Sequence, residues 1–197
     1  MEINIVFLGG PGKTQLIKFC CGYIFNERSS PTAGFYFVKK VIEIKSIKYT
    51  LFLWDNSGRE KFREMNKLLF KKSNFFILVY DIRCKESFDN IHYWYNEIHD
   101  SGKDPIIGVV GTHLDLYKER KVDTEIAKKF ADSIGAKFIE VSAKEDIEPF
   151  NIMLKELTNN YNKKYGSKDK EKKDNNIVPK KYLREFTKNT LLKYYKY

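Results

Sequence analysis

Several features that would place a chain among membrane or secreted proteins are missing from this sequence. Its longest apolar runs, such as F-F-I-L-V-Y at 75–80, have the length of a strand and fall far short of the roughly 20 residues that span a bilayer. The N-terminus has no basic region followed by an apolar stretch, so no secretory signal is expected. The three cysteines, Cys20, Cys21 and Cys84, lack the spacing of metal ligands and leave one unpaired. We therefore expect a reduced, cytoplasmic protein.

The sequence also lacks an excess of charge over most of its length, although its formal net charge is +10. Residues 160–197 hold 12 Lys and Arg against 4 Asp and Glu, whereas the first 159 residues hold 24 against 22. The basic character belongs to the tail and not to the body of the chain. We therefore expect no nucleic-acid partner.

Strand-like and helix-like patterns alternate over the first 160 residues. Strands are expected at 3–8, 38–45, 48–54, 75–80, 106–111 and 137–141. Apolar helix faces are expected at Phe88, Ile91, Trp94 and Ile98 and at Phe150, Met153, Leu154, Leu157 and Tyr161, and Ser87 and Asp123 are placed as helix caps. The strands at 38–45 and 48–54, joined by S-I or little more, must form an antiparallel hairpin. The expected fold class is α/β: three layers, with a six-stranded, mainly parallel sheet, one antiparallel strand, and helices on both faces.

The organisation beyond this body changes twice. Residues 1–161 are expected to form one domain, and the charged, non-periodic stretch 162–176 reads as a linker. Hydrophobic residues return at 177–197. This last segment has three open interpretations: a basic amphipathic helix for an anionic membrane, the opening of a further domain, or a solvated tail.

Ligands of such sheets bind beyond the carboxyl ends of the strands, and the first of these loops is G-G-P-G-K-T at 9–14. It is two residues shorter than the phosphate-binding pattern G-x-x-x-x-G-K-[ST]. A glycine-rich turn that opens a helix presents amides and a positive dipole to phosphate. Lys13 would then neutralise phosphate charge, and the hydroxyl of Thr14 would ligate Mg²⁺. An ordinary strand–helix turn is the alternative for this loop taken alone.

Three later loops favour the nucleotide interpretation. In W-D-N-S-G-R-E at 54–60, Asp55 is placed for Mg²⁺ through a water and Gly58 for a terminal phosphate. In G-T-H-L-D-L at 111–116, Asp115 would accept hydrogen bonds from guanine, which adenine does not offer. V-S-A-K at 141–144 could donate to the guanine oxygen and pack a lysine on the base. Each loop alone is more often a turn or a cap, but four in this order are hard to produce by chance.

On these motifs, residues 1 to about 160 resemble a small GTPase of the Ras superfamily, most closely the Rab branch. S-P-T-A-G-F-Y-F at 30–37 is similar to the first switch of that family, and W-D-N-S-G-R-E-K-F-R at 54–63 to the second. The resemblance implies a P-loop GTPase fold and a guanine-nucleotide switch of vesicle traffic that uses GTP, GDP and Mg²⁺. It also implies effector or regulator proteins that bind the switch regions, 26–37 and 55–72.

The resemblance assigns roles to residues by position. The implied nucleotide-binding residues are Gly9, Gly10, Gly12, Lys13, Thr14, Gln15, Phe25, Thr32, Gly58, His113, Asp115, Ser142, Ala143 and Lys144. The implied metal site consists of Thr14, Thr32 and, through a water, Asp55. Phe25 would contact the purine from its edge.

The chain departs from this family at three places in the site. The short phosphate loop lacks two residues that wrap the phosphates, and Pro11 stiffens it, which lowers the expected affinity for a triphosphate. Arg59 stands where the family has the glutamine that orients the attacking water, and arginine has no acceptor for that water. In T-H-L-D, Thr112 is expected to be too short to reach the base edge and the phosphate loop. His113 is expected either to stack on the base or to lie exposed beside it.

These departures leave two functional interpretations. One is an atypical, slowly hydrolysing switch with a guanine preference and reduced affinity, and the other is a pseudo-GTPase that keeps the fold and binds nucleotide weakly or as GDP. Residues 160–197 contain no cysteine for prenylation, so the chain is expected either to lack a lipid anchor or to be a fragment. Its basic tail would offer peripheral attachment to an anionic membrane.

Overall fold

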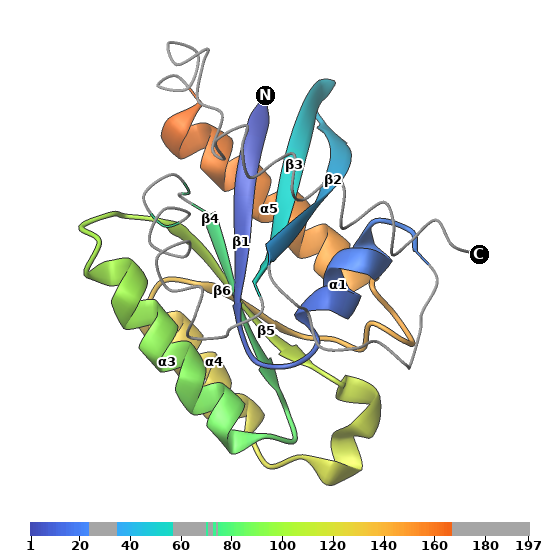
Figure 1. Ribbon diagram of the computed structural model, residues 1–197, viewed down its shortest axis with the longest axis vertical. Coiled ribbons are helices and arrows are strands. Elements are labelled where there is room, and N and C mark those ends of the chain that lie inside the picture. Colours follow the sequence, from blue (N-terminus) through green and yellow to red (C-terminus); the bar gives the residue numbers. More distant parts are fainter. Residues whose placement is uncertain (24–34, 57–69, 71–72, 74, 167–197) are drawn as a thin grey trace.

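The computed structural model describes residues 1–23, 35–56, 70, 73 and 75–166. Its strands are β1 (Glu2–Gly9), β2 (Phe35–Ile44), β3 (Ile47–Asn56), β4 (Phe75–Asp81), β5 (Ile106–Thr112) and β6 (Lys137–Glu140). Its helices are α1 (Lys13–Cys20), α3 (Lys85–His99), the 3-10 helix η2 (Leu114–Glu119), α4 (Thr124–Ser133) and α5 (Glu148–Tyr165). Figure 1 shows these strands as one sheet between two layers of helices, as the sequence predicts.

The sheet has the strand order β2-β3-β1-β4-β5-β6. Only β2 and β3 pair antiparallel, and every other neighbouring pair is parallel. The predicted hairpin is therefore confirmed, with its turn at Lys45 and Ser46 and β3 beginning at Ile47. Both turn residues have positive φ, 49° and 63°, which is the conformation that a two-residue hairpin needs to match the strand twist.

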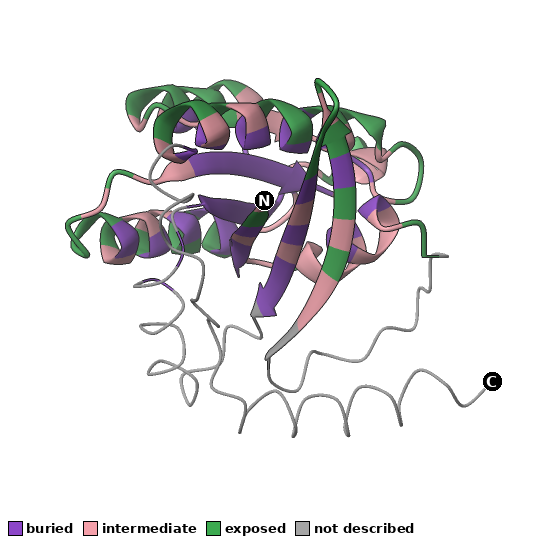
Figure 2. Cartoon of the chain, turned by 90° about the horizontal axis from the view of Figure 1, so that it is seen from above, coloured by how far each residue is buried: buried purple, intermediate pink, exposed green. Residues whose placement is uncertain are grey.

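Each face of the sheet is covered by a separate pair of helices. Leu16 and Ile17 of α1 pack with Phe150 and Leu154 of α5 on one face, and α3 and α4 cover the other. Figure 2 shows that the helices turn their buried residues toward the sheet and their exposed residues outward. Because β4 lies in the middle and has helices on both sides, all seven of its residues are buried.

One of the two predicted helix caps is confirmed and the other is wrong. Asp123 caps α4, and its carboxylate accepts from the amides of Glu125 (2.8 Å) and Ile126 (3.1 Å). The residue that precedes α3 is Cys84, so Ser87 lies inside the first turn of that helix. The Ser87 hydroxyl instead accepts from the amide of Asp81 (2.9 Å), which fastens α3 to the end of β4.

Helix α5 is longer than predicted and includes residues 162–165 of the expected linker. Tyr165 packs on Tyr161 with ring centroids 5.0 Å apart, and its hydroxyl donates to the carbonyl of Asp104. Lys164 forms an ion pair with the Asp104 carboxylate. These contacts continue the helix through a polar sequence. Within the described residues, no helix is long and apolar enough to cross a membrane.

Candidate nucleotide-binding site

Four loops meet at one edge of the sheet, because β1, β3, β5 and β6 are parallel and end there. Thr14, at the start of α1, donates to the carboxylate of Asp55 at the end of β3 (2.5 Å). The hydroxyl of Thr112 lies 3.2 Å from the carbonyl oxygen of Pro11, and the amide of Leu114 donates to the carbonyl of Val141 (3.4 Å). The structure therefore brings together the four loops that the sequence singles out, although only residues 55 and 56 of the second are described.

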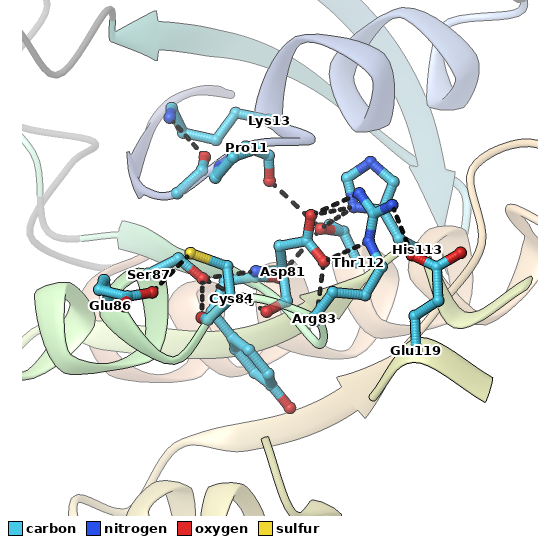
Figure 3. Close-up of polar contacts among 12 residues, drawn as sticks. Pro11, Lys13, Asp81, Arg83, Cys84, Glu86, Ser87, Thr112, His113 and Glu119 are labelled. Atoms are coloured by element: carbon cyan, nitrogen blue, oxygen red, sulfur yellow. Dashed lines mark hydrogen bonds and ion pairs between the residues drawn. The ribbon is translucent and has the colours of Figure 1, made fainter. Parts of the chain in front are cut away.

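Lys13 lies across the phosphate loop (Figure 3). Its ammonium donates to the carbonyls of Gly9 (2.8 Å) and Gly10 (2.7 Å). Burial lowers the pKa of Lys13, and the nearby carboxylate of Asp55 partly opposes that shift. The cation is thus held over the loop, where a phosphate would replace carbonyl oxygens as its partner. Gln15, the other expected residue of this turn, lies half-buried in α1.

The loop is packed so closely that its glycines have no room for a side chain. A Cβ atom on Gly9 would lie 2.3 Å from the carbonyl oxygen of Val79, and one on Gly10 would lie 2.7 Å from the Cβ of Ser87. The amide of Gly10 already donates to Val79 (2.7 Å), and Pro11 has no amide hydrogen. The backbone donors that can face phosphate therefore begin at Gly12, which is a smaller set than a full-length loop offers.

The pair formed by Thr14 and Asp55 fits a magnesium site. Asp55 is fully buried, and hydroxyl and carboxylate oxygens are the ligands that Mg²⁺ prefers. The structure describes no cluster of three or more His, Cys, Asp or Glu that could hold a metal, so a Mg²⁺ ion would depend on this pair together with phosphate oxygens. The third expected ligand, Thr32, lies outside the described residues.

Thr112 does reach the phosphate loop, and the expectation that it is too short for this contact is wrong. Its hydroxyl lies 3.2 Å from the carbonyl oxygen of Pro11 and 3.0 Å from that of Tyr80. The shortened loop runs close to the end of β5: a Cβ on Gly12 would lie 2.7 Å from the Thr112 oxygen. The threonine side chain is shorter than an asparagine, but the loop lies close enough for its hydroxyl to reach the Pro11 carbonyl.

His113 is held by one edge of its ring. Its Nδ1 lies 3.1 Å from a carboxylate oxygen of Asp81 and 3.0 Å from the hydroxyl of Thr112. Arg83 binds the same carboxylate through its Nε (3.1 Å) and Nη2 (2.8 Å). Burial of Asp81 disfavours its charged form, but hydrogen bonds from His113 and Arg83 outweigh this and hold its pKa well below the usual range. Stacking of the imidazole on a base stays a prediction.

The base end of the site consists of the third and fourth loops. Asp115 lies half-buried in the first turn of η2, and its carboxylate makes no hydrogen bond with the described part of the chain. The hydroxyl of Ser142 accepts from the amide of Glu145 (3.1 Å), which closes the turn of the fourth loop. Ala143 is half-buried and Lys144 is exposed. Among the described residues the Asp115 carboxylate thus has no hydrogen-bond partner, and its contact with a base stays a prediction.

A partly buried network that the sequence analysis missed fixes this end of the site. Arg120 donates to both carboxylate oxygens of Glu140 (2.7 and 2.8 Å). Glu140 also accepts from the hydroxyls of Tyr80 (2.8 Å) and Thr124 (3.1 Å). Burial and the Glu140 carboxylate raise the pKa of Tyr80 above its usual range. The network ties β4, β6 and the segment after η2 together. The one sequence signal that could have indicated it is a glutamate directly before V-S-A-K.

Several predicted site residues lie outside the described residues: Phe25, Thr32, Gly58 and Arg59. Most of the two switch regions, 26–37 and 55–72, does so too, apart from residues 35–37, 55, 56 and 70. Their roles stay predictions.

The fold and this site define a P-loop type of α/β nucleotide-binding protein. The model of the Ras family matches residues 4–162, and the chain belongs to that family. It is Rab-like: Ras-related protein Rab-21 of Homo sapiens is 34% identical over 148 residues, which are 74% of this chain and 66% of that protein. Ras-related protein RabJ of Dictyostelium discoideum is 36% identical over 149 residues, 74% of this chain and 58% of that protein.

Ras-related protein Rab-30 of Homo sapiens is 35% identical over 145 residues, 72% of this chain and 71% of that protein. The chain thus covers less than two thirds of the length of Rab-21 and of RabJ. Proteins of the Ras family bind GTP and GDP together with Mg²⁺, and the pair of Thr14 and Asp55 suits that ligand.

Proposed function

We propose that this protein is an atypical Rab-like guanine-nucleotide switch of vesicle traffic that hydrolyses GTP slowly. One observation carries the proposal. At the carboxyl edge of the sheet, the Lys13 ammonium lies over the phosphate loop next to the hydrogen-bonded pair of Thr14 and Asp55. A phosphate chain with its magnesium ion needs a cation, a hydroxyl and a carboxylate near the start of a helix. Here α1 supplies the first two and β3 supplies the buried carboxylate.

In the proposed site, Lys13 and the amides from Gly12 onward bind the phosphates. Thr14 and Thr32 would hold Mg²⁺ directly, and Asp55 would hold it through a water. When bound, the ion neutralises charge that develops on the phosphate oxygens. Asp115 accepts from the guanine edge, and the turn at Ser142 to Lys144 supports the base.

Slow hydrolysis follows from Arg59. The attacking water needs a group that accepts one of its hydrogens, and a guanidinium only donates. We expect a single-turnover rate below the roughly 10⁻⁴ s⁻¹ of intrinsic Ras hydrolysis. Arg59→Gln should raise it about tenfold or more, whereas Arg63→Gln in the same segment should not. Faster hydrolysis by the unaltered protein, or equal rates for both variants, would contradict this assignment.

The phosphate loop itself supports an alternative function, that of a pseudo-GTPase that binds GDP and does not respond to the third phosphate. The amide of Gly10 is already bonded to Val79, and Pro11 has none to give. Each lost donor to a charged oxygen weakens binding by about 1.5–3 kcal/mol. The two functions differ in the ratio of the GDP and GTP affinities, which a direct titration measures.

The proposed partners are effector or regulator proteins. At the end of the first switch region, Phe37 of β2 lies against Trp54 and Phe52 of β3, with ring centroids 4.7 and 5.6 Å apart. Phe37 and Phe52 are half-buried, so aromatic surface is left for a partner. We further propose a cytoplasmic protein that attaches peripherally to anionic membranes through the basic residues of 160–197, and that does not bind nucleic acid. Salt-dependent binding of acidic vesicles that is lost on removing 167–197 would support the membrane proposal.

A further inference from the structure

Thr112 joins the end of β5 to the phosphate loop at Pro11. Its side chain is 3% exposed, and its hydroxyl lies within hydrogen-bond distance of the Pro11 carbonyl as well as that of Tyr80. Pro11 has no amide hydrogen, so its own backbone cannot donate a hydrogen bond that would fix the loop here. The single hydrogen of the Thr112 hydroxyl is shared between the carbonyls of Pro11 and Tyr80, so this hydroxyl joins the loop at Pro11 to the end of β4.

The space between this threonine and the loop is filled. A Cβ on Gly12 would lie 2.7 Å from Oγ1, 2.8 Å from Cγ2 and 2.9 Å from Cβ of Thr112. Asparagine, the residue that the Rab pattern has here, carries one more heavy atom and extends further from the backbone. It would have to push the loop away, because packed interiors do not absorb added atoms freely.

A chain of hydrogen-bonding side chains holds Thr112 from the other side. The Asp81 carboxylate can only accept, so His113 carries a hydrogen on Nδ1. This hydrogen faces both the Asp81 carboxylate and the Thr112 oxygen. Arg83 fixes Asp81 with two further bonds, and Glu119 lies 3.6 Å from Arg83. Figure 3 shows these groups in a row that leads from η2 to the loop at Pro11.

We propose that Thr112 is a positioning residue matched to the short phosphate loop: it fixes the loop at Pro11, and the short loop and the short side chain require one another. This inference rests on the proposed nucleotide-binding function. The Rab pattern alone would predict that restoring its asparagine at position 112 strengthens nucleotide binding. We expect the opposite: Thr112→Asn should weaken nucleotide binding in this chain.

The test is a double-mutant cycle with Thr112→Asn and an insertion of two glycines between Gly10 and Pro11. In the short loop, Thr112→Asn should weaken GDP binding about tenfold and lower the melting temperature of the nucleotide-free protein. In the lengthened loop, the same substitution should cause neither loss, because the loop can move away from β5. Non-additivity of this kind is the signature of two groups in contact.

Two milder variants separate the hydroxyl from the volume. Thr112→Val keeps the shape and loses the hydrogen bond, so GDP binding should weaken roughly fivefold. Thr112→Ser keeps the hydroxyl and should stay within about twofold of the unaltered protein. The matched control is Ser73→Ala, which removes another buried hydroxyl that donates to a backbone carbonyl, that of Asn4 (2.7 Å), at the opposite edge of the sheet. It should lower stability without changing GDP affinity.

Two results would overturn the inference: GDP binding by Thr112→Asn that is as tight as in the unaltered short-loop protein, or equal losses in both loop lengths. A protein that binds no guanine nucleotide at all would instead refute the proposed function. The melting temperatures of the four nucleotide-free proteins would still decide whether Thr112 and the loop are matched.

Discussion

The phosphate end of the candidate site is held by close packing of backbone, whereas its base end is held by a partly buried ion pair. At the phosphate end, Gly9 and Gly12 lie against Val79 and Thr112 with no room for a Cβ. At the base end, the bidentate pair of Arg120 with Glu140 ties the third and fourth loops to the sheet. The two ends therefore respond to change in different ways.

The closely packed backbone of the phosphate end tolerates few substitutions, because a packed interior does not absorb added atoms freely. At the base end, Asp115 stays free of protein partners in the described region although its neighbours differ from the pattern. At the phosphate end, the loop lies against the end of β5, with the Thr112 hydroxyl 3.2 Å from the Pro11 carbonyl oxygen.

The largest expected effect concerns the stability of the base end. Glu140→Ala removes the acceptor of a partly buried pair and leaves the hydroxyl of buried Tyr80 without its partner, which should lower the free energy of unfolding by about 3–4 kcal/mol. Urea denaturation measures it. The control is Glu156→Ala in α5, whose pair with Lys137 (3.2 Å) is about half-exposed on both sides, and which should cost less than about 1 kcal/mol. Similar losses for the two variants would show that the network does not anchor the loops.

The next effect concerns the phosphate end. Lys13→Ala removes the cation that lies over the loop, so GDP affinity should fall roughly a hundredfold to a thousandfold. Calorimetric titration with GDP and Mg²⁺ measures the change. Lys128→Ala, an exposed lysine of α4, is the control and should leave the affinity unaltered. An effect of Lys13→Ala below about threefold would place phosphate elsewhere.

A smaller effect is expected on discrimination between bases. Asp115→Ala should reduce the preference for GDP over ADP by about tenfold to a hundredfold, because the donors on the guanine edge lose their acceptor. Competition binding measures the ratio. Asp132→Ala, an exposed acid of α4, should leave the ratio unchanged. An unchanged preference in Asp115→Ala would remove Asp115 from the site.

The smallest effect is a dependence on pH at the junction of the two ends. Because the pKa of Asp81 is held below its ordinary value by His113 and Arg83, ionised Asp81 stabilises the folded state above about pH 5, and this contribution is lost as pH falls below about 4. The difference in unfolding free energy between the unaltered protein and Asp81→Asn should therefore shrink on acidification. A difference that stays constant from pH 7 to about pH 3 would contradict the role given to this carboxylate.

Much of this fold follows from the sequence alone. Apolar runs of strand length and helix faces of period 3.6 locate the elements, and the short spacer predicts the hairpin, although its turn lies at Lys45 and Ser46, one residue earlier than the predicted S-I. The four loops could be assigned to one edge because parallel strands end together. The end of α5 could not be predicted, since Tyr165 is held by contacts with Asp104, a residue that no local pattern links to it.

The contacts that distinguish the site depend on register and loop path. Asp81 and Thr112 are neighbours in the register of β4 and β5, and only that register brings His113 to the Asp81 carboxylate. The bond from Thr112 to Pro11 joins residues 101 positions apart. The expectation that Thr112 is too short considered only the length of the side chain and took the loop to have its full length. It therefore predicted no such bond.

The most direct measurement is a titration of nucleotide-free protein with GDP, a non-hydrolysable GTP analogue and ATP, each with and without Mg²⁺. A slow switch should bind GDP and the GTP analogue with affinities within about tenfold of one another, more tightly with Mg²⁺, and ATP far more weakly. Tight GDP binding with little binding of the GTP analogue would instead establish the pseudo-GTPase, and equal binding of ATP would contradict a guanine-nucleotide site altogether.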